Sequence, residues 1–204
     1  MTDNLDQGLR ECLKYEIAKR GNKVAYISSQ PQTGERPYYL STIRDYQAID
    51  NDIQVDYFDL SENFSDEQLL GLTAYGTIYL SGGNTYVFMD SANKRDLLFV
   101  LKKHMEQDGL LIGASAGAIM MTPSIDIASN EDENTPNLED TTAFGFLDFE
   151  FHPHFSNSSE ELKYLSQYHK EKGVEIYVCK NGDGLFVSNN QVQLFGTTMK
   201  FADL

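Results

Sequence analysis

The sequence is poor in cysteine and contains no long apolar run. Its two cysteines are Cys12, on the apolar face of an expected helix, and Cys179, at the end of an apolar strand. Two such residues are more often buried thiols than a disulfide or a pair of metal ligands. No apolar run approaches the roughly 20 residues that span a bilayer, so we expect no membrane partner.

Cations are also scarce. Lysine and arginine number 16 against 31 aspartates and glutamates, which gives a formal net charge of -15. This charge would repel the phosphate backbone of a nucleic acid, so we expect no DNA or RNA partner. The start of the chain, residues 1–6, is polar and acidic and lacks the basic-then-apolar order of a secretion signal. We therefore expect a cytoplasmic protein.

Segments of strand character alternate with segments of helical period along the chain. The expected strands are Lys23–Ser29, Ile53–Leu60, Thr77–Leu80, 110–112, Phe146–Phe151 and 174–179. The expected helices lie before Gly21, at 38–49, after Ser65, at 86–106, after the serine at 115, and from 158 to about 171. This alternation predicts an α/β fold with a doubly wound, mainly parallel sheet and helices on both faces.

Two further segments complete this organisation. Residues 126–142 are acidic and without a clear period, and they predict a long loop. The pair Leu185–Ser188 and Gln191–Phe195, joined at Asn189-Asn190, predicts a closing β-hairpin. Because we find no repeat and no linker, we expect one domain over residues 1–204.

Residues 113–117 read Gly-Ala-Ser-Ala-Gly and directly follow the apolar run 110–112. This G-x-S-x-G pattern is typical of a nucleophile elbow, in which a buried strand turns sharply into a helix and presents one serine hydroxyl. Small residues are needed because the turn is strained and crowded. Small residues also surround a serine wherever a helix packs closely on a sheet. With a strand before it and a helix after it, Ser115 is the candidate nucleophile.

A serine hydroxyl needs a base, usually a histidine that a carboxylate orients. His152 and His154 follow the strand Phe146–Phe151. The functional loops of a parallel α/β sheet gather at the carboxyl ends of its strands, so either ring could reach Ser115. The two rings could instead hold a metal ion, but no third ligand lies nearby and Pro153 disturbs the geometry. We therefore expect no metal and no cofactor.

Acyl transfer also needs hydrogen-bond donors for the developing oxyanion. The backbone N–H of Ala116, directly after the serine, is one expected donor. A second is expected from Gly82-Gly83-Asn84, where glycines let the backbone approach a substrate closely. The same segment can also be a tight turn in which Asn84 caps the next helix.

Three segments occur in a fixed order: Ser81-Gly82-Gly83-Asn84-Thr85, Gly113–Ala118 and Pro153-His154-Phe155. Together they resemble the peptidase E and cyanophycinase family of serine peptidases, and the resemblance runs from about residue 23 to about residue 195. That family is similar in fold to the class I glutamine amidotransferases, with serine in place of cysteine at the elbow.

The resemblance implies that Ser115 is the nucleophile and His154 the base, with Gly83 and Ala116 as oxyanion donors. It further implies hydrolysis of peptide or isopeptide bonds in short substrates. An acidic residue such as aspartate stands on the amino side of the bond in the best known members. The expected partner is therefore a small peptide substrate.

Two features depart from the family pattern. Its members begin with a strand and a helix before the strand that aligns with Lys23–Ser29, whereas this chain starts at the helix. An exposed sheet edge would result, which a second copy in a homodimer could cover.

The family also places a carboxylate fifteen to eighteen residues beyond the serine. Here that stretch holds Asp132, the expected third member of the triad, and Glu131, the alternative.

Two other functions fit part of the pattern. An α/β-hydrolase esterase shares the order serine, acid, histidine, but there the histidine usually follows by far more than the 39 residues between Ser115 and His154. A catalytically inactive, amidotransferase-like binding module would explain the short amino-terminal side. A separation of Ser115 and His154 far beyond hydrogen-bond reach would favour that module.

Overall fold

The computed structural model describes residues 5–29, 35–61 and 65–203. The acidic start of the chain falls mostly on residues 1–4, which lie outside the described residues. Within the described part, no helix is long and apolar enough to cross a membrane.

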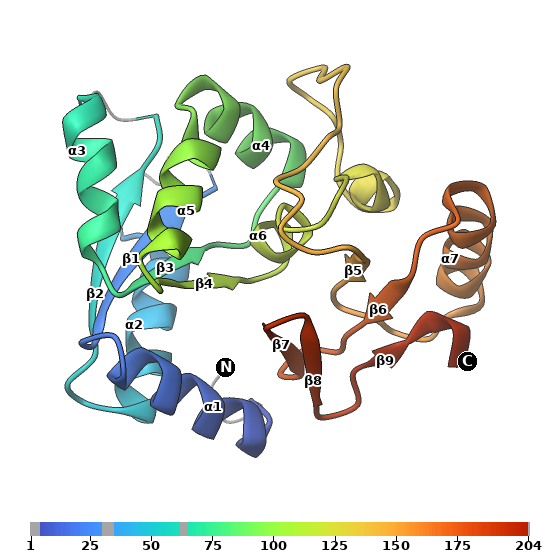
Figure 1. Cartoon of the computed structure of the whole chain (residues 1–204). Coiled ribbons are helices and arrows are strands. Elements are labelled where there is room, and N and C mark those ends of the chain that lie inside the picture. The colour runs from blue at the N-terminus through green and yellow to red at the C-terminus, as the bar shows by residue number, and fades with distance from the viewer. Residues whose placement is uncertain (1–4, 30–34, 62–64, 204) are drawn as a thin grey trace.

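A parallel sheet of four strands forms the larger part of the fold (Figure 1). Its strand order is β2-β1-β3-β4. The strands are β1 (Lys23–Ser28), β2 (Gln54–Asp59), β3 (Thr77–Leu80) and β4 (Leu110–Gly113). All three neighbouring pairs are parallel, so the carboxyl ends of these strands lie at one edge of the sheet.

Helices cover both faces of this sheet, which confirms the doubly wound prediction. On one face Val24 and Tyr26 of β1 share a core with α1 (Gln7–Ala18) and α2 (Pro37–Ile49). On the other face Ala25 and Ile27 pack with α4 (Thr85–Lys94), α5 (Leu97–Glu106) and α6 (Ala116–Ile119). The short α3 (Asp66–Leu70) and the 3-10 helix Gly71–Ala74 join this second layer.

Three tyrosines at one register level bind the strands together on the α2 face. Tyr26 lies opposite Tyr57 of β2 and Tyr79 of β3, and its ring stacks on both at centroid distances of 5.9 and 5.3 Å. Such same-face aromatic pairs stabilise a sheet beyond the area that they bury.

The single helix expected at 86–106 is wrong in one respect, because the chain forms two helices there. α4 ends at Lys94 and α5 begins at Leu97, with Asp96 between them at a φ of 49°. Aspartate tolerates this left-handed conformation better than most residues. The break re-aims α5 so that Leu97 and Leu101 are both fully buried.

A second sheet of three strands has the order β5-β6-β9. It contains β5 (Glu150–His152), β6 (Ile176–Val178) and β9 (Met199–Lys200), and α7 (Ser159–Lys172) connects the first two. The strand expected at Phe146–Phe151 starts later than predicted. The N–H groups of Phe146 and Leu147 instead donate to the carbonyl of Met121, which follows α6, so these two residues are not part of the strand.

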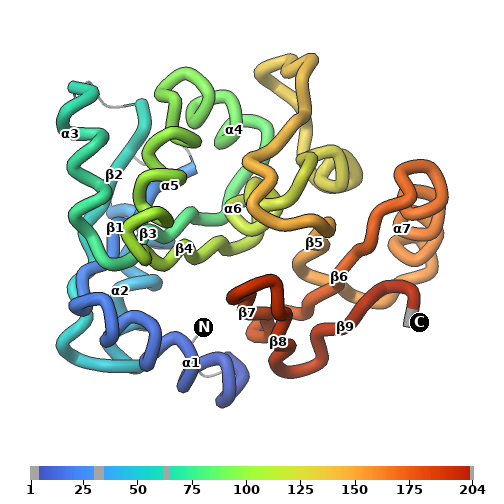
Figure 2. Tube along the Cα trace, in the orientation of Figure 1, coloured from blue at the N-terminus to red at the C-terminus, as the bar shows by residue number. Residues whose placement is uncertain are grey.

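The expected hairpin is confirmed as β7 (Gly184–Ser188) and β8 (Gln191–Phe195), with Asn189 and Asn190 both at positive φ. The loop expected at 126–142 contains a 3-10 helix, Asp126–Asn130, and another such helix, Phe201–Asp203, follows β9. The hairpin lies beside the start of α1, as Figure 2 shows, and the N–H of Asp6 donates to the carbonyl of Gly182 at 2.8 Å.

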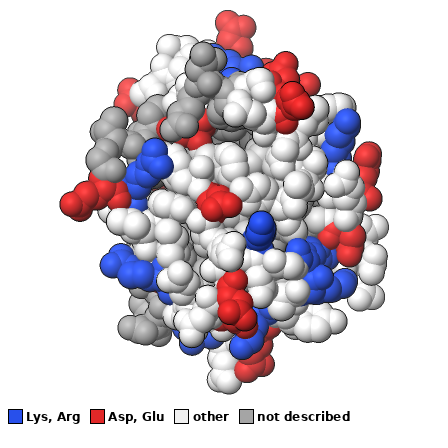
Figure 3. All heavy atoms as spheres, turned by 90° about the vertical axis from the view of Figure 1, so that its left-hand side faces the viewer, with Lys and Arg blue, Asp and Glu red and all other residues white. Residues whose placement is uncertain are grey.

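Charges of both signs are interspersed over the face of the molecule in Figure 3, around a broad neutral area. Acidic groups outnumber basic ones over the whole chain. No basic stripe of the kind that binds a nucleic acid stands out on this face.

Candidate active site

The chain turns from β4 into α6 at Ser115, whose backbone has a φ of 51° and a ψ of -114°. A non-glycine residue at positive φ is strained, and such strain is typical of a nucleophile elbow. The N–H of Ala114 donates to the carbonyl of Leu80, and the N–H of Gly117 to that of Ser81, each at 3.0 Å. These bonds to the end of β3 hold the turn in place.

Packing explains why glycine stands on each side of the elbow. A Cβ atom on Gly113 would lie 2.3 Å from the methyl carbon of Met121 and 2.6 Å from the Cα of Ala118. A Cβ on Gly117 would lie 2.3 Å from the carbonyl oxygen of Leu80. Both contacts are too short for any side chain, so the crowding that the pattern predicts is present.

His154 lies directly against the serine. Its Nε2 is 2.8 Å from the Oγ of Ser115. His154 follows β5 and has a φ of 61°. On either side of it, the N–H of Phe155 donates to the carbonyl of Cys179, and the N–H of Cys179 to that of His152. The neighbouring strand β6 therefore fixes the backbone that presents the ring.

The other ring nitrogen of His154 meets an amide. Nδ1 is 2.5 Å from the Oδ1 of Asn181, which follows the end of β6. Sequence reasoning missed Asn181 because it sought a carboxylate. Its position just past the expected strand 174–179 was the available signal, since functional side chains gather at the carboxyl ends of parallel strands. The sequence did not show that this strand neighbours the one before His154.

The two expected carboxylates lie elsewhere. Asp132 accepts the N–H of Thr85 at 2.8 Å, in the first turn of α4. The adjacent Asn84 caps the same helix by accepting the N–H of Val87, and its Nδ2 donates to the carbonyl of Glu133. Among the described residues, no hydrogen bond joins Asp132 to His154. The loop that carries it is docked on a helix N-terminus, where a carboxylate is favourable.

His152 is buried and faces Glu161 instead of the serine. Its Nε2 is 2.8 Å from Oε1 of Glu161, whose Oε2 accepts from the N–H and hydroxyl of Ser156 and the N–H of Asn157. Burial acts to raise the pKa of Glu161, but the hydrogen bonds from His152 and Ser156 lower it overall. The ring of His152 therefore supports the turn that carries His154.

Glu131 approaches this buried pair. One nitrogen or oxygen atom from each of Glu131, His152 and Glu161 lies within 4.8 Å of the other two. Within the part of the chain that the structure describes, these three side chains are of the types and spacing that could hold a metal ion. His154 is not part of this group, because its two ring nitrogens face Ser115 and Asn181. The two histidines that the sequence offered as a pair thus face different partners, Glu161 for His152 and Ser115 for His154.

Gly82 and Gly83 lie next to the elbow. A Cβ on Gly82 would be 3.3 Å from the Cβ of Ser115. Gly83 has a φ of 137°, and a Cβ on it would lie 2.1 Å from the Oγ of Ser29. Among the described residues, the N–H groups of Gly83 and Ala116 have no backbone acceptor. Gly82 therefore lies beside the serine, and Gly83 lies against Ser29.

Ser115, His154 and Asn181 open into a groove of about 560 Å³. One wall is β4 and another is the segment from Cys179 to Ser188, while α1 and α2 close the side away from the elbow. Cys179 is buried and free, and burial raises the pKa of its thiol to about 11. Cys12 is also free and lines the groove, but it is only partly buried. Both cysteines are thus unpaired, and Cys179 alone of the two is the buried thiol that was expected.

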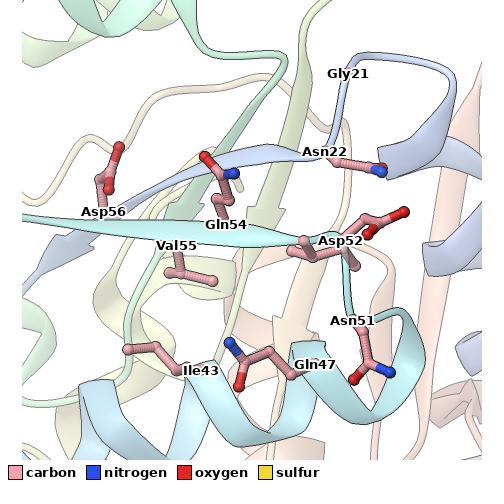
Figure 4. A pocket seen from close by; sticks show the side chains of 10 residues that line it. Gly21, Asn22, Ile43, Gln47, Asn51, Asp52, Gln54, Val55 and Asp56 are labelled. Carbon is pink, nitrogen blue, oxygen red and sulfur yellow. The ribbon is translucent and has the colours of Figure 1, made fainter.

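A second hollow lies against β2 and the end of α2, and Figure 4 shows its lining side chains. Its residues include the amides Asn22, Gln47 and Gln54 and the carboxylates Asp52 and Asp56. It shares no residue with the groove at Ser115. Without a nucleophile or a histidine among these residues, we assign it no chemistry.

Comparison with known proteins places these features in a family. The model of peptidase family S51 matches residues 2–195. An uncharacterized peptidase of Pasteurella multocida is 27% identical over 140 residues, which cover 68% of this chain and 67% of that protein. Peptidase E of Salmonella arizonae is 32% identical over 128 residues, or 58% of this chain and 55% of that protein.

A solved structure shares the fold. A protein of Listeria monocytogenes, assigned provisionally to peptidase E, has a TM-score of 0.74 at 21% identity, and the match covers 91% of each chain. At that identity the likeness supports the fold alone. Because the family match takes in the glycine turn, the elbow and the histidine, and almost the full sequence, the chain belongs to peptidase family S51, a family of serine peptidases.

Proposed function

We propose that this protein hydrolyses peptide bonds in short peptides, with Ser115 as nucleophile and His154 as general base. The observation that carries the proposal is the 2.8 Å contact between Nε2 and Oγ. It is within the hydrogen-bond reach that proton transfer needs. A binding module without activity would have no need of this contact, nor of the strained backbone at Ser115.

In the proposed reaction, Nε2 of His154 takes the hydroxyl proton as Oγ attacks the scissile carbonyl carbon. The backbone N–H groups of Gly83 and Ala116 donate to the resulting oxyanion. His154 then gives the proton to the leaving amine, and the C–N bond breaks. The same ring then takes a proton from a water molecule, whose oxygen attacks the acyl carbon. The bond from that carbon to Oγ breaks, His154 returns the proton to Oγ, and the acid is released.

Asn181 sets the tautomer of the base. The Oδ1 atom of Asn181 only accepts hydrogen bonds, so Nδ1 of His154 carries a hydrogen and donates it to Oδ1. The Nε2 atom is then without a hydrogen and can accept from the hydroxyl of Ser115. An amide therefore takes the place that a carboxylate holds in most triads. Asp132 would act indirectly, because it anchors the loop 131–133 to the start of α4.

A preference for an acidic residue beside the scissile bond needs a cation in the groove. Lys180 lines it next to Asn181. Arg20 lines it too, but the guanidinium is held by Glu16 and Asp108. We therefore propose Lys180 as the group that would select an acidic side chain. Isopeptides with a free acidic residue would meet the same cation.

The experiment is a screen of dipeptides, short peptides and isopeptides with the wild type and with Ser115→Ala. Turnover is expected to disappear in Ser115→Ala while the thermal unfolding midpoint is kept. Ser166→Ala, on the exposed side of α7, is the matched control because it removes a serine hydroxyl remote from the groove. If a fluorophosphonate probe labels Ser115→Ala as strongly as the wild type, Ser115 is not the nucleophile.

A further inference from the structure

β4 has one edge that no strand covers among the described residues. It pairs with β3 only. The N–H groups of Leu110 and Ala114 donate to carbonyls on the β3 side, those of Gly76 and Leu80, each at 3.0 Å. Because the groups of a strand alternate in direction, the N–H and C=O of Leu111 and Gly113 point away from β3. They are free to pair with another extended chain.

The end strand of the second sheet borders the same groove. β5 pairs with β6 only. The N–H of Glu150 donates to the carbonyl of Glu175, and the carbonyl of His152 accepts from Cys179. The backbone groups of Phe151, between them, therefore face away from β6. Phe151 and the segment from Gly109 to Ser115 all line the groove, so one edge from each sheet borders it.

The walls of this space are apolar and incompletely covered. Leu111 and Ile112 of β4 and Phe186 of β7 are only partly buried. Leu147 and Leu185 are partly buried as well, against a small cluster built around Phe151. Side chains in the middle of a parallel α/β sheet are normally buried on both faces. Their partial exposure marks a place where an extended segment would complete the packing.

We infer that this groove binds a peptide as an added strand, paired with the edge of β4 and with its scissile bond at Ser115. The inference rests on the proposed peptidase function and specifies its substrates as short, extended peptides, with apolar side chains beside β4 and an acidic residue next to the scissile bond, where Lys180 would select it. Strand addition supplies affinity through main-chain hydrogen bonds and specificity through alternate side chains. The edge groups of Leu111 and Gly113 are the matching partners.

Continuity with the catalytic pair favours a substrate as the occupant. β4 ends at Gly113, two residues before the nucleophile, and the groove includes Ser115, His154 and Asn181. A peptide that lies along β4 therefore extends towards the Oγ atom of Ser115. A strand from a second copy would occupy the same path and would block Ser115, which does not suit an enzyme.

The length of β4 sets the length of the bound segment. Its four residues, Leu110–Gly113, extend about 13 Å at about 3.3 Å per residue, so about four substrate residues can pair beside it. The value of kcat/KM is therefore expected to rise with chain length on one side of the scissile bond. The rise should end after about four residues and amount to about tenfold or more.

The test uses two series of peptides that share one acidic residue at the scissile bond and are otherwise apolar, one lengthened towards the amino end and one towards the carboxyl end. A length-dependent rise in one series supports the inference. The longest peptide is then remade with N-methylated backbone amides, which cannot donate to β4, and the gain should be lost with the wild-type enzyme. Equal kcat/KM values for all lengths, in an enzyme that cleaves the shortest peptides, would overturn the strand inference and leave the proposed function standing.

A variant of the enzyme tests the edge itself. Leu111→Pro removes the N–H that points away from β3 and keeps the bonds to β3. It should bring the ratio of kcat/KM between the longest and shortest peptides towards one. Leu111→Ala, which keeps the N–H, should preserve most of the ratio. If Leu111→Pro folds and retains the full ratio, pairing with β4 is disproved, and if it does not fold the N-methylated peptides decide.

A binding measurement separates the inference from the chemistry. Ser115→Ala protein is titrated with the same fluorescent peptides, and Kd should fall with length as kcat/KM rises. If no peptide of either series is cleaved, the proposed function fails while this measurement still tests the groove. A concentration-dependent dimer that the longest peptide does not dissociate would instead assign the groove to a second copy and overturn the inference.

Discussion

His154 and Asn181 meet through Nδ1 and Oδ1 at 2.5 Å, so the group that orients the imidazole in this protein is an uncharged amide. An amide fixes the tautomer and the ring plane as a carboxylate does, but it adds no negative charge beside the ring. Lys180 and Asp183, on the same segment as Asn181, are charged residues that line the groove with it. An amide in the place of a carboxylate therefore has consequences that can be measured.

Asn181→Asp is expected to move the acid limb of the kcat/KM profile to higher pH by about one unit. The new carboxylate favours the protonated ring, which cannot act as the base. Asn181→Ala should lower kcat about ten- to a hundredfold because the ring loses its orienting acceptor. Asn190→Asp, at the exposed hairpin turn, adds the same charge elsewhere and should leave the limb in place. An unshifted limb in Asn181→Asp would show that this residue does not act on the base.

Asp132→Ala tests the carboxylate expected from the sequence. Its side chain holds the first turn of α4, so the variant is expected to lose about 1 kcal/mol of unfolding free energy, the usual cost of a helix cap. We expect kcat to change less than threefold. Chemical denaturation and peptide kinetics on the same preparation separate these effects. A loss of kcat as large as that of Asn181→Ala would indicate that Asp132 acts as the third member of the triad after all.

Local patterns were predicted well because they depend on nearby residues. The crowding at Gly113 comes from Ala118 and Met121, within one strand, turn and helix, whereas Gly117 meets Leu80 of the neighbouring β3. The hairpin turn at Asn189 and Asn190 is equally local. The break between α4 and α5 was missed because Asp96 carries no glycine or proline signal, and its left-handed backbone follows from tertiary packing of Leu97.

The partner of His154 could not be predicted from patterns of nearby residues. Asn181 reaches the ring only because β5 and β6 are neighbours in the sheet, and strand order is a long-range property. An amide also has no titration that would mark it as part of a site. Asp132 also makes a long-range contact, with the N–H of Thr85 at the start of α4. It therefore meets a helix terminus instead of a histidine, although its spacing from Ser115 suited a triad.

Gly83→Ala tests the oxyanion donor. The backbone at Gly83 has a φ of 137°, and an added Cβ would lie 2.1 Å from the hydroxyl of Ser29, so the turn must move. The loss of one oxyanion donor is expected to lower kcat about a hundredfold or more. Gly145→Ala is the control, because Gly145 also has positive φ but its Cβ would meet nothing within 4 Å. A similar loss of kcat in both variants would mean that backbone strain, and not the donor, is responsible.

Glu150 gives the protein a pH-dependent stability that is separate from catalysis. Burial raises the pKa of this carboxyl from its ordinary 4.5 to about 7, although the hydroxyl of Thr122 lies 2.7 Å away. The backbone of Ser124 also acts on this carboxyl, as do the charges of Asp126 and Lys172, and Tyr168 lies near it. Because the folded pKa is raised, the folded state favours the protonated form. Its contribution to stability is complete below pH 4.5 and is lost as the pH rises towards 7.

Glu150→Gln should remove this dependence. In the wild type, the free energy of unfolding from urea titrations is expected to fall by roughly 3 kcal/mol between pH 4.5 and 8 on account of this group. The variant should show a flatter profile and be the more stable protein at pH 8, since a neutral amide is cheaper to bury than a carboxylate. Glu106→Gln, at the exposed end of α5, removes a carboxylate without this burial and should keep the wild-type slope. Parallel profiles for the wild type and Glu150→Gln would show that Glu150 is already ionised in the folded protein at neutral pH.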